Sequence, residues 1–212
     1  MLMVFTLGFH ADHVIRRLFK VREQSIDAIH IVTARPVVRA VKQAYSEIVS
    51  IVDRMRLPPP KLFDIAIESP AASTYILWRE WREHPHIVAD LSGGMRPVVA
   101  ITMTALALTT QRSYVELYIA GEREDAAEAR IPLNIITYAL TKTLSQEKKE
   151  ILQNLLKTPG LTQHHLAQLL GKSDRTIRAH LSELKKYELV QEKEKKLYPT
   201  DWAKILIELN QP

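Results

Sequence analysis

A regular alternation of short apolar runs with longer segments of helical periodicity constrains the fold of this chain more than any other feature. The apolar runs have strand character and occupy residues 1–7, 26–33, 62–67, 87–91 and 114–120; the helical segments occupy residues 11–22, 37–56, 70–83 and 97–110. After a charged surface loop expected over 121–128, residues 130–133 are expected to add an edge strand. Each helix carries the chain back to the start of the next strand, so the strands pair in parallel. The alternation therefore predicts an α/β domain with a mostly parallel sheet and helices on both faces.

The segment from residue 98 to residue 108 is apolar or threonine all the way round and carries no charge. A helix with this composition has no solvated face. We expect it to be buried, either within the domain or partly against a second copy of the chain.

From residue 145 onward the pattern changes to short helical segments. Ser145, Thr162 and Ser173 can each cap a helix, and two short strands over 189–192 and 196–198 enclose a lysine-rich turn. Three short helices followed by a hairpin predict a winged helix-turn-helix. The charge pattern changes as well: residues 1–141 hold 16 basic and 15 acidic residues (+1), and residues 142–212 hold 13 and 9 (+4). We therefore expect two domains, 1–141 and 142–212.

The third short helix carries the candidate DNA-binding residues. If Ile177, Leu181 and Leu184 face the core, then Arg175 and Arg178 face the solvent, where they suit guanine edges or phosphates. Lysines in the hairpin turn suit salt-sensitive phosphate contacts. The predicted DNA-binding set is Lys172, Ser173, Arg175, Thr176, Arg178, Lys193, Lys195 and Lys196. Glu188 stands where glycine is commonest after such a helix, and Glu192 and Glu194 weaken the positive field of the hairpin.

In the first domain, Asp90-Leu91-Ser92-Gly93-Gly94-Met95-Arg96-Pro97 follows the fourth strand. Glycines let backbone amides approach a ligand, and the start of the next helix attracts anions, so this segment is a candidate phosphate-binding loop. A tight strand-to-helix connection is the structural alternative. Neither a P-loop nor a Gly-x-Gly-x-x-Gly spacing is present.

Two further loops are expected at the same edge of the sheet, because ligands of doubly wound sheets bind beyond the carboxyl ends of the strands. Gly8-Phe9-His10 follows the first strand and Arg35-Pro36 follows the second. Together the loops offer amides, a stacking ring and two arginines, which are groups that suit a nucleotide. The predicted ligand-binding set is Gly8, Phe9, His10, Arg35, Pro36, Ser92, Gly93, Gly94, Met95 and Arg96.

Composition limits other functions. Hydrophobic residues make up 46% and charged residues 25% of the chain, which is typical of a folded protein. Cysteine is absent, which excludes thiol chemistry and disulfides and fits a reducing interior. Neither histidine pair has a carboxylate at metal-ligand spacing, so we expect no metal. No histidine is tied by sequence to Ser92, the candidate nucleophile, so we expect no catalytic residue, and no cofactor is expected. No basic leader and no apolar stretch near about 20 residues is present, so a cytoplasmic protein without a membrane partner is expected.

A family resemblance rests on Thr6-Leu7-Gly8-Phe9, Leu57-Pro58-Pro59-Pro60, the Asp90–Arg96 segment and the winged helix. Together these resemble the archaeal CRISPR-associated Rossmann-fold (CARF) transcriptional regulators. The resemblance implies a Rossmann-like domain that forms a homodimer and binds a cyclic oligoadenylate, cyclic tetra-adenylate above all, across the two-fold axis. It also implies that the winged helices bind double-stranded DNA. Gly8, Phe9, Ser92, Gly93, Gly94, Met95 and Arg96 match the family motifs, whereas His10, Arg35 and Pro36 come from their loop positions.

Two alternatives stay open. The first is a ring nuclease that cleaves the cyclic oligoadenylate with the ribose 2′-hydroxyl as nucleophile, aided by His10, Ser92 and Arg96. The second is a scaffold whose winged helix binds protein. Salt dependence separates protein binding from DNA binding, because phosphate contacts weaken steeply as salt rises.

Overall fold

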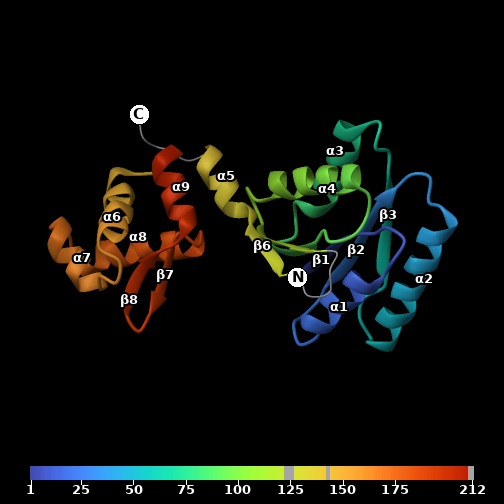
Figure 1. Ribbon diagram of the computed structural model, residues 1–212, viewed down its shortest axis with the longest axis horizontal. Helices are drawn as coiled ribbons and strands as arrows, with labels where there is room; N and C mark the ends of the chain where they lie inside the picture. Colours follow the sequence, from blue (N-terminus) through green and yellow to red (C-terminus); the bar gives the residue numbers. More distant parts are fainter. Residues whose placement is uncertain (122–126, 142–143, 210–212) are drawn as a thin grey trace. The chain divides into compact units, whose positions relative to one another are not determined.

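The computed structural model describes residues 1–121, 127–141 and 144–209. Its first unit is built on a six-stranded sheet with the order β3-β2-β1-β4-β5-β6 (Figure 1). The strands are β1 (Leu2–Thr6), β2 (Ala28–Ala34), β3 (Pro60–Ile65), β4 (His86–Asp90), β5 (Tyr114–Ala120) and β6 (Glu128–Pro132). All neighbours pair in parallel except β5 and β6, which are antiparallel. The predicted mostly parallel sheet is confirmed. The charged loop expected over 121–128 falls mainly on residues 122–126, which lie outside the described residues.

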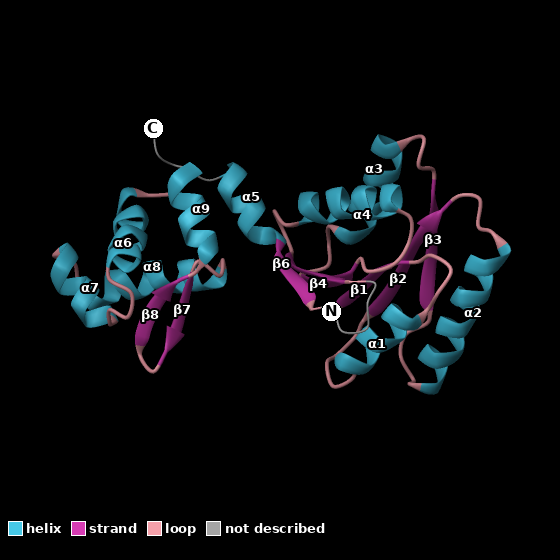
Figure 2. Cartoon of the chain, in the orientation of Figure 1, coloured by secondary structure: helices cyan, strands magenta, loops and turns pink. Residues whose placement is uncertain are grey.

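Helices cover both faces of this sheet, as predicted (Figure 2). One face carries α1 (Asp12–Lys20) and α2 (Arg39–Arg54), and the other carries α3 (Pro70–Trp81) and α4 (Arg96–Thr109). Side chains alternate along β1, so Met3 and Phe5 join the apolar cluster under α1 and α2, while Leu2 and Val4 join the cluster under α3 and α4. Every residue of β1 is buried, because the strand lies in the middle of a sheet that is covered on both sides.

The charge-free helix α4 is not buried all round. Val98, Ala105 and Leu106 lie in the core, but Met103 and Leu108 on the outer side expose 40% and 46% of their surface. The expectation that the whole helix is buried within its own domain is therefore wrong for this protomer. Contact of its outer face with a second copy stays a prediction.

The second unit has the predicted winged-helix architecture. Its helices are α5 (Leu133–Thr141), α6 (Gln146–Lys157), α7 (Gln163–Leu170), α8 (Asp174–Lys186) and α9 (Asp201–Leu209), and its hairpin consists of β7 (Val190–Lys193) and β8 (Lys196–Pro199). By contacts the chain divides into Met1–Leu133 and Asn134–Pro212. This division differs from the expected one after residue 141, because Ile135 and Tyr138 of α5 pack into the apolar core of the second unit. None of the described helices is long and apolar enough to cross a membrane.

Candidate ligand pockets and nucleic-acid interface

The strand order creates a crevice beside β1. The chain leaves β1 toward α1 on one face of the sheet and leaves the adjacent β4 toward α4 on the other, so the two connections diverge. Such a switch point is where doubly wound sheets bind ligands. The two glycine loops meet here: a Cβ atom placed on Gly8 would lie 3.2 Å from the backbone nitrogen of Gly94.

Gly93 and Gly94 are required for different physical reasons. Gly94 has a φ of +85°, a conformation that side-chain-bearing residues rarely adopt. At Gly93 the reason is space, because an added Cβ would lie 2.1 Å from Cε1 of His13. The two glycines therefore bring the loop backbone against the His13 side chain of α1.

A largely apolar pocket of about 430 Å³ lies between the loops that follow β1, β2 and β4. Phe9 and Met95 stand at it with 64% and 52% of their surface exposed, which leaves their apolar side chains available to a flat ring. The lining residues are Leu7, Gly8, Phe9, His10, Thr33, Ala34, Arg35, Pro36, Val38, Val41, Ile67, Gly94 and Met95. These features suit a nucleotide base.

A second, more polar pocket of about 530 Å³ adjoins the first and shares Gly8, Phe9, His10 and Gly94 with it. Its wall also includes Asp12, His13, Arg16, Ser92, Gly93 and Gly121. Hydroxyl, imidazole, guanidinium and glycine amide groups suit a sugar and a phosphate. Two adjoining pockets of opposite character match the two halves of a nucleotide.

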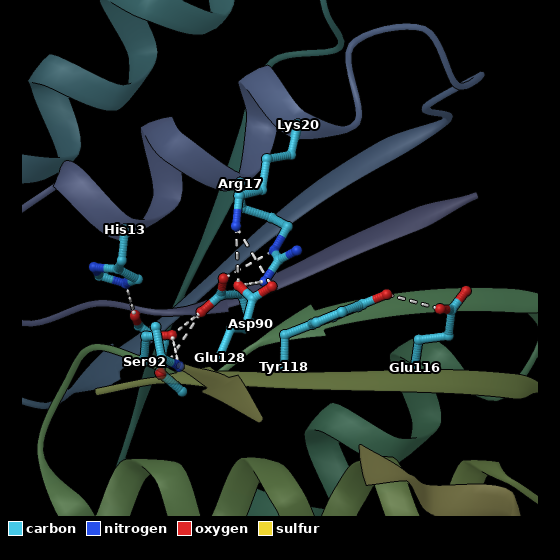
Figure 3. A network of polar contacts seen from close by, with 10 residues as sticks. His13, Arg17, Lys20, Asp90, Ser92, Glu116, Tyr118 and Glu128 are labelled. Carbon is cyan, nitrogen blue, oxygen red and sulfur yellow. Dashed lines mark hydrogen bonds and ion pairs between the residues drawn. The ribbon is translucent and has the colours of Figure 1, made fainter. Parts of the chain in front are cut away.

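A largely buried ion-pair network lies next to Ser92 of the glycine loop (Figure 3). Nε of Arg17 donates to Oδ2 of Asp90 at 2.9 Å, and a terminal nitrogen of Arg17 donates to Glu128. The guanidinium carbon also lies 3.9 Å from the centroid of the Tyr118 ring, within cation–π range. The network joins α1, β4, β5 and β6, and it compensates a guanidinium that is almost wholly removed from water.

Ser92 is bound into the same network. Its backbone N–H donates to Oδ1 of Asp90 at 3.0 Å, its hydroxyl donates to the same oxygen, and the N–H of Ala120 donates to that hydroxyl at 2.8 Å. The hydroxyl proton is therefore already donated to Asp90, and Ser92 can offer a ligand only a remaining oxygen lone pair as an acceptor. These bonds fix the loop rather than activate the serine as a nucleophile.

Arg35 reaches the apolar pocket from the loop after β2. Its Nε donates to Oδ2 of Asp64 at 3.0 Å and a terminal nitrogen donates to the Asp64 carbonyl. The hydrogen bond from Arg35 lowers the pKa of Asp64 from its ordinary value, so the carboxylate keeps its charge. A phosphate at Arg35 would compete with that partner.

The helix-turn-helix presents a basic face. Gly171 closes α7 in the left-handed conformation, and the Ser173 hydroxyl caps α8 by accepting from the Thr176 N–H at 3.1 Å. Ile177, Leu181 and Leu184 are buried, as predicted. Arg175 and Arg178 are exposed and form no ion pair with any residue that the structure describes.

The wing adds three exposed lysines, Lys193, Lys195 and Lys196, around its turn. Glu192 pairs with Lys185 of α8, which removes part of the negative charge that was expected to weaken the field of the wing. Lys172 is exposed in the turn before α8. Cationic groups thus lie on α8, in the turn before α8 and on the β7–β8 hairpin.

Two family matches cover most of the chain. Residues 1–132 match the family described as the Csa3 CRISPR-associated Rossmann-like domain, and residues 148–191 match the winged helix-turn-helix DNA-binding family. The chain belongs to the Csa3 CRISPR-associated family. The resemblance to CRISPR-associated Rossmann-fold regulators that the sequence motifs indicated is confirmed.

Known proteins extend this comparison. The Csa3-family chain is 28% identical over 191 residues to the "CRISPR locus-related putative DNA-binding protein Csa3" of Saccharolobus solfataricus, covering 90% of this chain and 79% of that protein. Among solved structures, it resembles Can2 of Sulfobacillus thermosulfidooxidans in complex with cyclic tetra-adenylate (10% identity, TM-score 0.41) and VC1899 of Vibrio cholerae (10%, 0.44). The alignments cover 97% and 99% of this chain but only 63% and 65% of those longer chains.

The structure gathers nine of the ten predicted ligand residues of this Csa3-family protein around the two pockets. The exception is Arg96, which is exposed at the start of α4 and lines neither pocket. Sequence reasoning missed His13 and Arg16, although their place in the first turns of the helix after Gly8-Phe9-His10 was a usable signal. It also missed Arg17, for which the sequence holds no local sign. Among the described residues, no group of three or more His, Asp and Glu is arranged to hold a metal ion.

Proposed function

We propose that this protein is a CRISPR-associated transcriptional regulator that binds a cyclic oligoadenylate in its Rossmann-like domain and double-stranded DNA through its winged helix. One observation supports the ligand most: an apolar pocket and a polar pocket adjoin at the switch point and share the Gly8–His10 and Gly94 loops. Membership of the Csa3 family supports the same ligand class. Cyclic tetra-adenylate is the ring that we favour, with the adenine in the apolar pocket and the phosphate beside the glycine amides.

Calorimetric titration of cyclic tetra-adenylate into the purified protein tests the ligand. Binding with a rise in melting temperature is expected, because a ligand that binds only the folded state stabilises it. AMP serves as the comparison and is expected to bind more weakly. Absence of both heat and thermal shift with the ring would overturn the ligand assignment. The Arg96→Ala variant tests the family-derived role of Arg96, and unchanged affinity would remove that residue from the site.

DNA binding is proposed through Lys172, Ser173, Arg175, Thr176 and Arg178, with Lys193, Lys195 and Lys196 on the wing. Fluorescence anisotropy with DNA from upstream of the protein's own gene tests it at several salt concentrations. We expect affinity to fall steeply with salt, and Arg175→Ala or Arg178→Ala to cost about 1–3 kcal/mol. Lys157→Ala on α6 removes the same charge outside the proposed interface and is the control. Absence of binding to this DNA at moderate salt would overturn the assignment.

Ring cleavage is the second candidate function. His10 and Ser92 do line the same polar pocket, which is the observation that favours it. The Ser92 hydroxyl already donates to Asp90, so the ribose 2′-hydroxyl would have to be the nucleophile. Chromatography of cyclic tetra-adenylate after incubation with the protein decides: an intact ring excludes cleavage.

A further inference from the structure

The hydrogen-bond role of Nε2 of His13, a residue of the polar pocket, follows from its contact with Thr6. Nε2 of His13 lies 2.9 Å from the carbonyl oxygen of Thr6, in the buried region between α1 and β1. A carbonyl oxygen only accepts, so Nε2 carries the hydrogen and donates it. A neutral imidazole has a single N–H, so in that form of the ring Nδ1 is an acceptor.

The position of this ring is fixed as well. Only 9% of His13 is exposed, the Gly93 backbone lies against its ring, and the Thr6 hydroxyl donates to the Gly93 carbonyl at 2.5 Å. Figure 3 shows His13 extending from α1 toward the segment that carries Ser92. Within residues 1–121, 127–141 and 144–209, no group donates a hydrogen bond to Nδ1. His13 belongs to the wall of the polar pocket, and no described protein group satisfies its Nδ1 atom.

We propose that Nδ1 of His13 accepts a hydrogen bond from the ribose 2′-hydroxyl of the bound ligand, which makes the site selective for a ribonucleotide ring. This inference rests on the proposed function. In a ring of 3′,5′-linked adenylates, the 2′-hydroxyl and the adenine amino group are the two kinds of hydrogen-bond donor. The base fills the apolar pocket and the phosphates only accept, so the donor available to the polar pocket is the 2′-hydroxyl.

Two substitutions separate this role from a purely structural one. His13→Gln keeps a side-chain amide near the position of Nε2, where it can still donate to the Thr6 carbonyl, and it removes the acceptor at Nδ1. His13→Asn places its carbonyl oxygen near the position of Nδ1 and loses the bond to Thr6. Each variant and the wild type are titrated by calorimetry with cyclic tetra-adenylate and with the same ring made of 2′-deoxyadenylates.

We expect the wild type to bind the ribonucleotide ring about ten to a hundred times more tightly than the deoxy ring, because the deoxy ring leaves the acceptor unsatisfied. His13→Gln should lose most of this ratio, and His13→Asn should keep it with a lower melting temperature. Comparing ratios within each variant removes the effect of the sugar conformation of the deoxy ring, which is common to all three proteins.

The outcomes that overturn the inference differ from those that overturn the proposed function. Equal affinity of the wild type for the two rings overturns the 2′-hydroxyl contact and leaves ligand binding standing. The reverse pattern, in which His13→Gln discriminates between the rings like the wild type and His13→Asn does not, also overturns the 2′-hydroxyl contact. That pattern would indicate that His13 acts structurally, through its bond to Thr6. Failure of the wild type to bind either ring overturns both proposals.

Discussion

Asp90 shows how one buried charge sets the shape of the candidate site. Only 3% of the residue is exposed, and its two oxygens serve different partners: Oδ2 accepts from Arg17, and Oδ1 accepts from the backbone and hydroxyl of Ser92. The carboxylate therefore neutralises a buried guanidinium and also fixes the start of the glycine loop. Glu128 pairs with the same guanidinium, but its side chain is 28% exposed.

The unequal burial of these two acids leads to a stability prediction. Asp90→Ala should lower the unfolding free energy by about 3–5 kcal/mol, because it leaves Arg17 buried with a weaker partner. Glu128→Ala is the matched control and should cost about 1 kcal/mol, since water screens and replaces that partner. Denaturant unfolding measures both. Equal losses would contradict the primary role of Asp90.

His30 gives a prediction for pH dependence. The ring accepts a hydrogen bond from Nε1 of Trp81 at 3.0 Å, and burial lowers the pKa of His30 from 6.5 to about 4. At pH values between these two pKa values, His30 binds a proton in the unfolded chain but not in the folded chain. The folded state is therefore less stable as the pH drops from 6.5 toward 4. The full loss is about 3 kcal/mol.

Urea unfolding at several pH values measures this effect, with the wild type compared with His30→Asn. The asparagine keeps an acceptor for Trp81 but does not titrate in this range, so the variant should show a flatter decline. Parallel curves for the two proteins would show that His30 is not the group responsible.

Residues were predictable from the sequence where a local pattern marked them. The loop glycines, Phe9 and Arg35 follow strands, and the rule for parallel sheets is enough to bring them together. His13 and Arg17 were not predictable in the same way. Their roles depend on Thr6, Gly93 and Asp90, which only the packing of α1 against β1 and β4 brings near.

At the scale of elements, the wing turn is the clearest case of local strain. β7 and β8 are joined through Glu194 and Lys195, which have φ values of 51° and 63°. A two-residue turn with two positive φ angles favours Asn-Gly. Replacing Glu194 by Asn and Lys195 by Gly should raise the unfolding free energy of the winged helix by about 1 kcal/mol, without changing net charge. Thermal unfolding measures the gain, and a lower melting temperature would contradict the assigned strain.

Elements were predicted best where their amphipathic or apolar pattern had clear boundaries. The strands of the first unit and the helices α6 to α8 were found within a few residues, although the expected side-chain cap forms at Thr162 and Ser173 and not at Ser145. Helix α5 was missed, because Leu133 follows β6 directly and no turn residue or cap separates strand from helix. The outer face of α4 was misjudged because a charge-free sequence does not reveal whether its outer side chains have a covering partner.

At the scale of the whole molecule, the exposed apolar face of α4 is the main surface that the protomer itself does not cover. Together with α3 it forms an apolar groove of about 530 Å³, whose wall includes Tyr75, Trp78, Ile101 and Leu108. Exposed apolar surface of this kind marks an interaction site more often than a solvated one. The homodimer that the family resemblance implies would cover it. Because α4 starts directly after the glycine loop, a two-fold axis near this helix would bring two copies of the loop toward one ring.

The dimer and its ligand stoichiometry are therefore tested together. The wild type should have twice the 24.3 kDa mass of one chain in sedimentation and bind one cyclic tetra-adenylate ring per two chains in calorimetry. Leu108→Asp should cost the dimer about 2 kcal/mol or more, roughly thirtyfold in its dissociation constant, because it buries a charge in the interface. Leu169→Asp is the matched control, since Leu169 is 61% exposed on α7, outside the groove. The monomeric variant should then bind the ring more weakly than the control, because in the proposed dimer each chain would supply half of the contacts. A Leu108→Asp protein that keeps the dimeric mass would place the interface elsewhere, and full ring affinity in a monomer would show that one chain holds the complete site.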